Sequence, residues 1–127
     1  MKKKYIYIIF LFVFLIAIYY SRNDIVLYFN SLRVGYYEEN NLYDECINIY
    51  SDMIETKPTA YEFYINRGVA YAQLEEYQKA EKDFKTALSL NDKDKDIYYN
   101  LYLIYDIKNS TKKNYYFEKY QELKEND

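Results

Sequence analysis

The sequence predicts an all-α protein in which one N-terminal transmembrane helix precedes about three antiparallel helix pairs. The 127 residues include two Gly and one Pro, too few for a chain that folds through many tight β-turns. Residues 5–20 form an uncharged, apolar run long enough for a membrane helix. Beyond this run, apolar residues recur at helical spacing, and their pattern repeats after 34 residues.

The composition excludes several kinds of functional site. There is no His, which removes the commonest general base and the commonest metal ligand. The single cysteine, Cys46, excludes an internal disulfide and a Cys-rich zinc site. No glycine-rich loop is present to hold a phosphate group. We therefore expect a binding protein rather than an enzyme, with no cofactor and no metal.

Charge is distributed unevenly along the chain. Residues 1–22 carry four basic and no acidic side chains, a formal charge of +4. Residues 23–127 carry 13 basic and 20 acidic side chains, a formal charge of −7. An acidic domain repels phosphate backbones, so we do not expect nucleic acid as a partner.

The first element, residues 1–22, is predicted to be a transmembrane signal-anchor with a helix over about 4–21. The uncharged run spans about 24 Å as a helix, against a hydrocarbon core of about 30 Å, and Lys4 and Arg22 can lengthen it by snorkelling. Tyrosines stand at both ends of the run, as in the aromatic belts of spanning helices: Tyr5, Tyr7, Tyr19 and Tyr20.

Two other interpretations of this run are open. A buried core helix is disfavoured because the run is apolar on all sides. A cleaved signal peptide is the stronger alternative, but bulky residues, including Ile18 and Tyr20, occupy positions where cleavage needs small ones. We favour the uncleaved anchor. Three lysines precede the span and only Arg22 follows closely, so we expect a cytoplasmic N-terminus and an extracytoplasmic domain.

The second element, residues 23–127, is predicted to be an array of repeats. Four apolar residues have apolar or aromatic counterparts 34 positions earlier: Tyr77, Ala80, Phe84 and Ala87 correspond to Tyr43, Cys46, Tyr50 and Met53. Tyrosines recur at the same interval: Tyr37, Tyr71 and Tyr105, and also Tyr64 and Tyr98. Sequence self-similarity at a fixed period is typical of helical repeat proteins.

These positions resemble the tetratricopeptide repeat family. The best copy, residues 61–94, has the family's pattern of aromatic and small residues: Tyr64, Gly68, Tyr71, Ala80, Phe84 and Ala87. It departs from the pattern at Arg67, where Leu is usual, and at Asp92, where Pro is usual. Weaker copies cover about 27–60 and 95–127. The resemblance implies a right-handed α-solenoid of about three helix pairs.

Helices are expected near the following ranges: 24–37, 42–55, 59–73, 77–90, 95–107 and 112–125. Plausible N-caps precede four of them: Asn23 or Asp24, Asn41, Thr59, and Ser110 or Thr111. The last helix departs from the family pattern. A shift of one or two residues would place Tyr116, Phe117 and Tyr120 on its inner face.

The acidic stretch 91–96 resembles the start of a calcium loop. The full loop needs a Gly next and a Glu at its twelfth position, but Ile97 and Leu103 stand there. We interpret the stretch as a solvated turn, with Asp94 and Asp96 at the positive end of the next helix.

The resemblance also implies a partner-binding groove lined by the first helix of each pair. The positions of this sequence that match the groove-lining places of the family are Glu62, Ile65, Asn66, Val69, Gln73, Asp96, Tyr99, Asn100, Leu103 and Ile107. Asn66 and Asn100 share one repeat position, where each either bonds a partner's backbone or braces the adjoining helix. Because Glu62 and Asp96 stand where carboxylate-binding members have Lys or Arg, we expect a basic or mixed apolar partner segment.

These observations predict a membrane-tethered scaffold that binds a partner peptide or helix in the concave groove. An alternative is structural self-association, in which the tyrosine-rich terminal repeat pairs with its twin in a homodimer. The sequence identifies neither the partner nor the oligomeric state.

Overall fold

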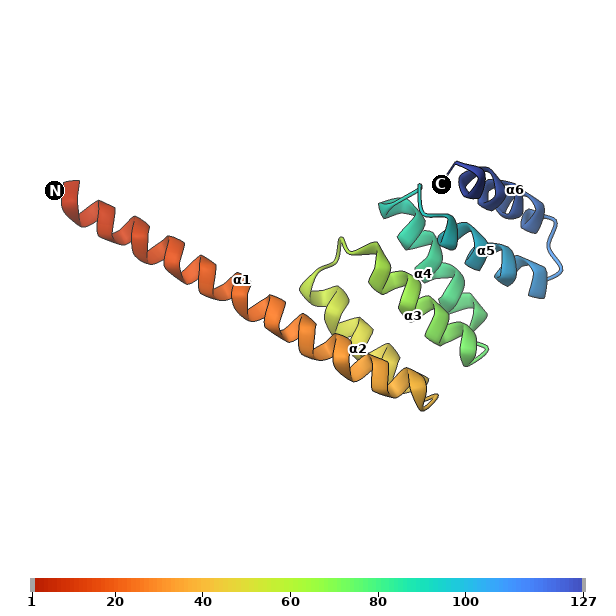
Figure 1. Cartoon of the computed structure of the whole chain (residues 1–127), viewed down its shortest axis with the longest axis horizontal. Coiled ribbons are helices and arrows are strands. Elements are labelled where there is room, and N and C mark those ends of the chain that lie inside the picture. Colours follow the sequence, from red (N-terminus) through yellow and green to blue (C-terminus); the bar gives the residue numbers. More distant parts are fainter. Residues whose placement is uncertain (1, 127) are drawn as a thin grey trace.

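The computed structural model describes residues 2–126, and within this range it contains six helices and no strand (Figure 1). The helices are α1 (Lys2–Glu39), α2 (Tyr43–Thr56), α3 (Tyr61–Gln73), α4 (Tyr77–Leu90), α5 (Lys95–Ile107) and α6 (Lys112–Glu125). The predicted all-α fold class is confirmed. The five helices from α2 onward begin and end within two residues of their predicted ranges.

The prediction of a separate helix over 24–37 is wrong. The membrane segment and the first repeat helix form one continuous helix of 38 residues, α1. Asn23 and Asp24 were expected to cap a new helix, but no Gly or Pro interrupts the chain there. Because helix-forming residues flank both positions, the backbone continues through them, and Asn23 lies beside Thr56 of α2.

The N-terminal part of α1 packs against nothing in the described chain. From Phe10 to Tyr20 the apolar side chains are exposed, and the hydropathy window that begins at Ile8 averages 1.6 with none of it buried. This excludes a core helix of the same chain and leaves a helix long and apolar enough to cross a membrane. Lys4 and Tyr7, expected at the cytoplasmic end, have side chains outside the described residues.

The helices pack in chain order, each against the next, and α3 also touches α5. One core cluster joins α1, α2 and α3 around Cys46 and Val34. A second joins α3, α4, α5 and α6 around Phe84 and Leu101. Helix α3 contributes side chains to both clusters and so links them. The helices of the array lie side by side in chain order, as in a helical solenoid (Figure 1).

Helices α3 and α4 approach each other closely at Gly68. A Cβ atom added there would stand 2.7 Å from the Phe84 ring, well inside van der Waals contact. Both Gly68 and Ala80 are buried, as the repeat pattern predicts. The small residues therefore let α3 and α4 come close enough for Phe84 to fill the space between them.

The turn inside each helix pair has the same geometry three times. Asn41, Glu75 and Asn109, each 34 residues from the next, adopt φ of 57°, 60° and 48°. The next N–H in each turn donates to a tyrosine carbonyl at 2.9 Å: Leu42 to Tyr37, Glu76 to Tyr71, and Ser110 to Tyr105. This is the left-handed helix ending that Asn and Gly favour. Asn41 therefore ends α1, and its predicted role as N-cap of α2 is wrong.

The connection between consecutive pairs also repeats. The Tyr64 hydroxyl donates to the Pro58 carbonyl at 3.1 Å, and the Tyr98 hydroxyl donates to the Asp92 carbonyl at 3.0 Å. The acceptor is a backbone oxygen, so Asp92 serves as well as proline in this contact. The Asp94 side chain caps α5 by accepting from the Asp96 N–H at 2.9 Å, which fits the interpretation of 91–96 as a turn.

The helix starts predicted at Thr59 for α3, and at Ser110 or Thr111 for α6, are nearly correct. Helix α3 follows Ala60 rather than Thr59, because the chain first closes a turn in which the Ala60 N–H donates to the Lys57 carbonyl. Helix α6 follows Thr111, which makes no side-chain capping bond, and the Ser110 hydroxyl accepts from the Lys112 N–H at 3.4 Å.

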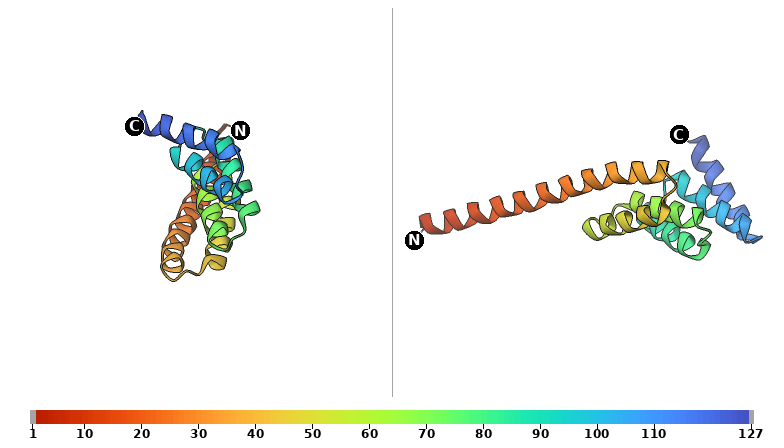
Figure 2. Two further views of the ribbon diagram at one scale, coloured as in Figure 1. Left: turned by 90° about the vertical axis from the view of Figure 1, so that its right-hand side faces the viewer. Right: turned by 90° about the horizontal axis from the view of Figure 1, so that it is seen from below.

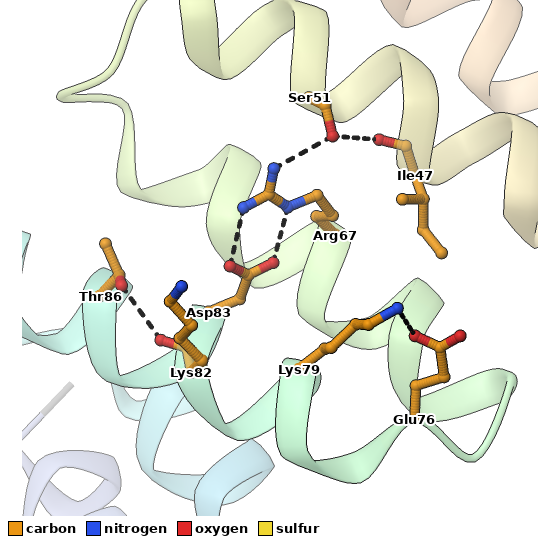
Figure 3. Close-up of polar contacts among 8 residues, drawn as sticks. All are labelled: Ile47, Ser51, Arg67, Glu76, Lys79, Lys82, Asp83 and Thr86. Carbon is orange, nitrogen blue, oxygen red and sulfur yellow. Dashed lines mark hydrogen bonds and ion pairs between the residues drawn. The ribbon is translucent and has the colours of Figure 1, made fainter.

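Arg67, which departs from the repeat pattern, ties three helices together (Figure 3). Its Nε and Nη2 donate to the two carboxylate oxygens of Asp83 at 2.7 and 2.8 Å. Its Nη1 donates to the Ser51 hydroxyl at 3.0 Å, and that hydroxyl donates to the Ile47 carbonyl. The bidentate pair satisfies the buried Asp83 carboxylate, and bonding to Asp83 raises the pKa of Arg67.

Helix α6 covers α5 with aromatic rings, as the predicted register shift requires. Tyr116 stacks on Tyr105 with ring centroids 5.1 Å apart and planes inclined by 4°. Phe117 lies against Tyr102, and Tyr120 lies against Tyr99, each pair at 5.1 Å. No described residue of α6 is fully buried, so the helix covers the end of the array with one apolar stripe.

We predict that Gly68→Ala destabilises the array by about 1–3 kcal/mol, because the added methyl group collides with the Phe84 ring. Urea unfolding of the full chain in detergent, followed by circular dichroism, measures the loss. The matched control is Gly35→Ala in α1, where an added Cβ has no atom within 4 Å. We expect that control to be neutral or slightly stabilising, and equal effects of the two substitutions would contradict the close packing.

Candidate protein-binding groove

A groove with a volume of about 200 Å³ lies between α3 and α5. Val69 and Gln73 line it from α3, and Asn100 and Leu103 line it from α5. These are four of the residues predicted for the partner-binding surface. Ile107, also predicted there, lies in the same wall. Helix periodicity places them together, since residues four apart share one face of a helix.

The floor of the groove contains Tyr77 and Phe84, which the sequence interpretation assigned only to packing, together with Ala72 and Ile104, to which it assigned no role. Phe84 is 1% exposed and Ile104 is 2% exposed, so both belong to the core and are reached only at the base of the groove. Their second role could not be predicted from the sequence, because an apolar residue at helical spacing predicts burial equally well at every depth.

Asn66 and Asn100 occupy the same repeat position but differ in their surroundings. The Asn66 side chain lies near the Tyr50 hydroxyl of α2, and this hydroxyl donates to Glu38 of α1 at 2.9 Å. Burial and the bond to Glu38 raise the pKa of Tyr50, so this hydroxyl stays protonated. One repeat later the residue matching Tyr50 is Phe84, which has no hydroxyl. Asn66 lies exposed beside α2 and outside the groove lining, whereas Asn100 lines the groove.

Asn100 keeps part of its amide available to a partner. Its Nδ2 donates to the Asp96 carbonyl one turn earlier at 2.9 Å. An amide group has two N–H donors and a carbonyl acceptor, so this single bond leaves hydrogen-bonding capacity at the groove wall.

The remaining predicted residues lie outside the groove lining. Ile65 is half-buried and packs against the core, and Glu62 and Asp96 are exposed on the first turns of α3 and α5. The Tyr99 ring contacts Tyr120 of α6 and is 41% exposed. The structure thus separates the predicted surface into an apolar groove and acidic positions at the start of each helix.

No charged residue is present among the described residues that line the groove. Apolar side chains form most of its surface, and Gln73 and Asn100 provide the amides. Such a groove can accept an apolar side chain and hydrogen-bond the backbone that carries it.

A larger hollow of about 530 Å³ runs along α4, but it is a poor binding site. All of its lining residues come from this one helix: Gln78, Glu81, Lys82, Lys85, Thr86 and Ser89. It therefore has no facing wall to enclose a ligand. Its main feature is Glu81, which accepts from Lys85 and from the Tyr105 hydroxyl, both at 2.6 Å, and from Lys108.

Glu81 links α4 to α5 through a carboxylate that stays ionised. Partial burial alone would raise its pKa, but the hydrogen bonds from Lys108, Lys85 and Tyr105 outweigh burial and lower the pKa to about 2. The same bond raises the pKa of Lys85. The network therefore stabilises the junction between the second and third pairs at neutral pH.

Comparison with known proteins identifies the repeat. Residues 61–94 match the family profile described as tetratricopeptide repeat. A 52-residue segment is 38% identical to the Small glutamine-rich tetratricopeptide repeat-containing protein 2 of Saccharomyces cerevisiae. This match covers 41% of the chain and 15% of that relative, so the chain corresponds to a small part of it.

Solved structures share the fold at low sequence identity. The first TPR of Spaghetti (RPAP3) bound to an HSP90 peptide superposes with a TM-score of 0.73 at 22% identity, covering 80% of this chain and 81% of that one. MamA MSR-1 gives 0.71 at 22% identity, covering 79% and 58%. A chain of the CopN-Scc3 complex gives 0.71 at 18% identity, covering 76% and 58%.

These findings support the tetratricopeptide repeat family for residues 61–94, and the described helices share the fold of solved tetratricopeptide repeat domains. The fold is that of a tetratricopeptide α-solenoid, preceded by one long apolar helical segment.

We predict that Glu81→Gln lowers the stability of the full chain in detergent by about 1–2 kcal/mol at pH 7, because the replacement loses its charge-assisted bonds. The folded-state pKa lies below the ordinary 4.5, so the stabilisation is present above pH 4.5 and is lost as pH falls toward about 2. Urea midpoints at pH 7 and pH 3 should differ less for Glu81→Gln than for the parent protein.

The control for this measurement is Glu118→Gln, which removes a carboxylate from an exposed position of α6. It should retain the pH dependence of the parent. If Glu81→Gln also retained it, the network would not contribute to stability.

Proposed function

We propose that this protein is a membrane-tethered scaffold that holds a partner peptide or helix in the groove between α3 and α5. The observation that supports this function best is the groove itself, where Val69 and Leu103 face each other across an apolar floor. Tetratricopeptide repeat proteins are typically non-enzymatic scaffolds, and the proposal assigns no reaction to the chain.

The partner segment is proposed to carry an apolar anchor residue flanked by basic residues. A groove of about 200 Å³ suits one apolar side chain, with Gln73 and Asn100 available to its backbone. Exposed Glu62 and Asp96 begin the two helices that form the walls, and their charge favours a basic flank. The first TPR of RPAP3, which shares this fold and was solved bound to an HSP90 peptide, supports a peptide as the ligand class.

The tether is proposed to be the apolar part of α1, with the N-terminus in the cytoplasm and the array outside. Three lysines precede this part and Arg22 alone follows closely, which favours that orientation. Tethering confines the groove to the bilayer surface and raises its effective concentration toward membrane partners.

A second candidate function is self-association through the terminal repeat. Tyr115 and Phe117 of α6 are 55% and 40% exposed, so aromatic surface is available at the end of the array. This interaction remains an alternative to partner binding.

The groove is tested by a photo-crosslinking amino acid, benzoylphenylalanine, placed at Leu103 in the full chain in native membranes. We expect a crosslinked product to a second protein, and at least a tenfold loss of it when Val69→Asp is added, because a charge in the groove repels an apolar anchor.

The matched control places the same probe at Leu90, which is 41% exposed against 38% for Leu103 but lies on α4 outside the groove. Circular dichroism checks that Val69→Asp leaves helicity unchanged. Equal crosslinking from Leu90 and Leu103 would rule out the groove as the binding surface.

The tether is tested by fractionating cells that express the full chain. We expect the protein to stay in the membrane pellet after alkaline carbonate extraction, and a C-terminal tag to be cut by protease added from outside. Intact mass distinguishes a retained anchor from a cleaved signal. Release by carbonate, or a tag protected until the membrane is opened, would contradict the proposed topology.

A further inference from the structure

Helix α1 has a second apolar face that nothing in the described chain covers. Five large apolar residues beyond the proposed span are each between 53% and 62% exposed: Ile25, Tyr28, Phe29, Leu32 and Tyr36. Among the described helices α1 packs against α2 alone, and Figure 2 shows it running along one edge of the array. A stripe of this kind on a helix in water calls for a partner.

The five residues occupy one side of the helix, within an arc of about 100°. The residues that pack toward α2 lie on the opposite side: Leu27, Val34 and Tyr37. Asn30, on that same side, is 8% exposed. The exposed stripe is therefore a separate surface and not the edge of the array's own core.

The bilayer is poorly placed to cover this stripe. Asn23 lines shallow hollows together with Asp52, Glu55 and Lys57, which come from the far end of α2 and the turn after it. Charged groups would then stand level with the end of the span, and the hydrocarbon would stop near Tyr20. Residues 25–36 would lie outside the lipid, beside α2.

The stripe continues the face of α1 that enters the membrane. Leu11, Ile18, Ile25 and Leu32 follow each other at intervals of seven residues, and all four are exposed. Aliphatic residues repeated every seven positions are typical of two parallel helices that pack along their length. Since α1 is one unbroken helix, the spacing keeps its register from the span into the domain.

We propose that a second copy of this chain packs along this stripe, α1 against α1, in a parallel two-fold dimer. The parallel arrangement rests on the membrane tether of the proposed function, because two copies inserted in one bilayer with the same topology must run in the same direction. The contact lies on α1 and is distinct from self-association through the terminal repeat.

The available surface is large enough for such a dimer. Covering the five side chains on both copies would remove up to roughly 1,300 Å² from water, which reaches the range of about 1,200–2,000 Å² for specific interfaces. The same stripe faces itself across a two-fold axis, so each apolar residue meets apolar residues.

Charge along the borders of the stripe agrees with this symmetry. Arg22 and Arg33 flank one border, and Asp24 flanks the other. In a parallel two-fold pair, each border of one helix lies beside the opposite border of its partner. The interface between the two α1 helices therefore places the basic border of each copy beside the acidic border of the other, which avoids repulsion between like charges.

Dimerisation would place two α3–α5 grooves on one membrane at a fixed separation. A partner with two binding segments, or a dimeric partner, would then bind both grooves. The second binding step is intramolecular, which raises the overall affinity without any new contact in either groove.

The test is disulfide crosslinking of the full chain in native membranes, in a Cys46→Ala background. Cys46 is fully buried, and the matching residue one repeat later is Ala80, so alanine suits the position. Single cysteines replace Ile25 and Leu32 on the stripe, with Val26 and Ser31 as matched neighbours off it. After oxidation by copper phenanthroline, we expect at least fivefold more covalent dimer from Ile25→Cys and Leu32→Cys than from Val26→Cys and Ser31→Cys.

Equal dimer yields at all four positions, or none at Ile25 and Leu32, would overturn the proposal. Dimer formed from Phe117→Cys alone would overturn it in favour of the terminal repeat. As a second measurement, Ile25→Glu with Leu32→Glu should reduce the mass seen by light scattering in mild detergent from two chains to one, and an unchanged mass would count against the stripe.

Carbonate extraction of the same membranes separates failure of the dimer from failure of the tether. A chain that stays in the membrane without crosslinking at Ile25 or Leu32 refutes the dimer only. A chain released by carbonate refutes the tether, and the parallel dimer that rests on it is then overturned as well.

Discussion

The contact between Gly68 and the Phe84 ring controls the distance between α3 and α4 and, through it, the groove. Only a residue without a side chain leaves room for the ring, because any Cβ would stand 2.7 Å from it. Phe84 in turn forms part of the groove floor, beneath Val69 and Leu103. The packing that closes the core and the surface proposed for partner binding therefore share one side chain.

Repetition explains both the stability of this array and the differences between its copies. The turns at Asn41, Glu75 and Asn109 share one backbone geometry, so each pair closes in the same way. Equivalent positions nevertheless differ in their surroundings. Asn66 lies near the Tyr50 hydroxyl, whereas Asn100, one repeat later, lines the groove together with Phe84.

The continuity of α1 joins the proposed anchor and the array into one mechanical unit. A helix without Pro from Lys2 to Glu39 leaves no flexible linker between span and domain. In the proposed topology, the orientation of the groove toward the bilayer is set by how the helices pack on α1, and not by a tether of variable length. This rigidity is also what would keep two copies in register along the exposed face of α1.

The sequence by itself determined the helical class, five of the six helices to within two residues, and the close packing at Gly68 and Ala80. Helical spacing and the 34-residue period depend only on local order along the chain, which composition and pattern record. Only the tertiary structure decided which predicted residues share a surface. In the structure Val69 and Leu103 line one groove, the Tyr99 ring contacts α6, and α1 continues through Asn23. These outcomes depend on the packing of neighbouring helices, which local sequence does not record.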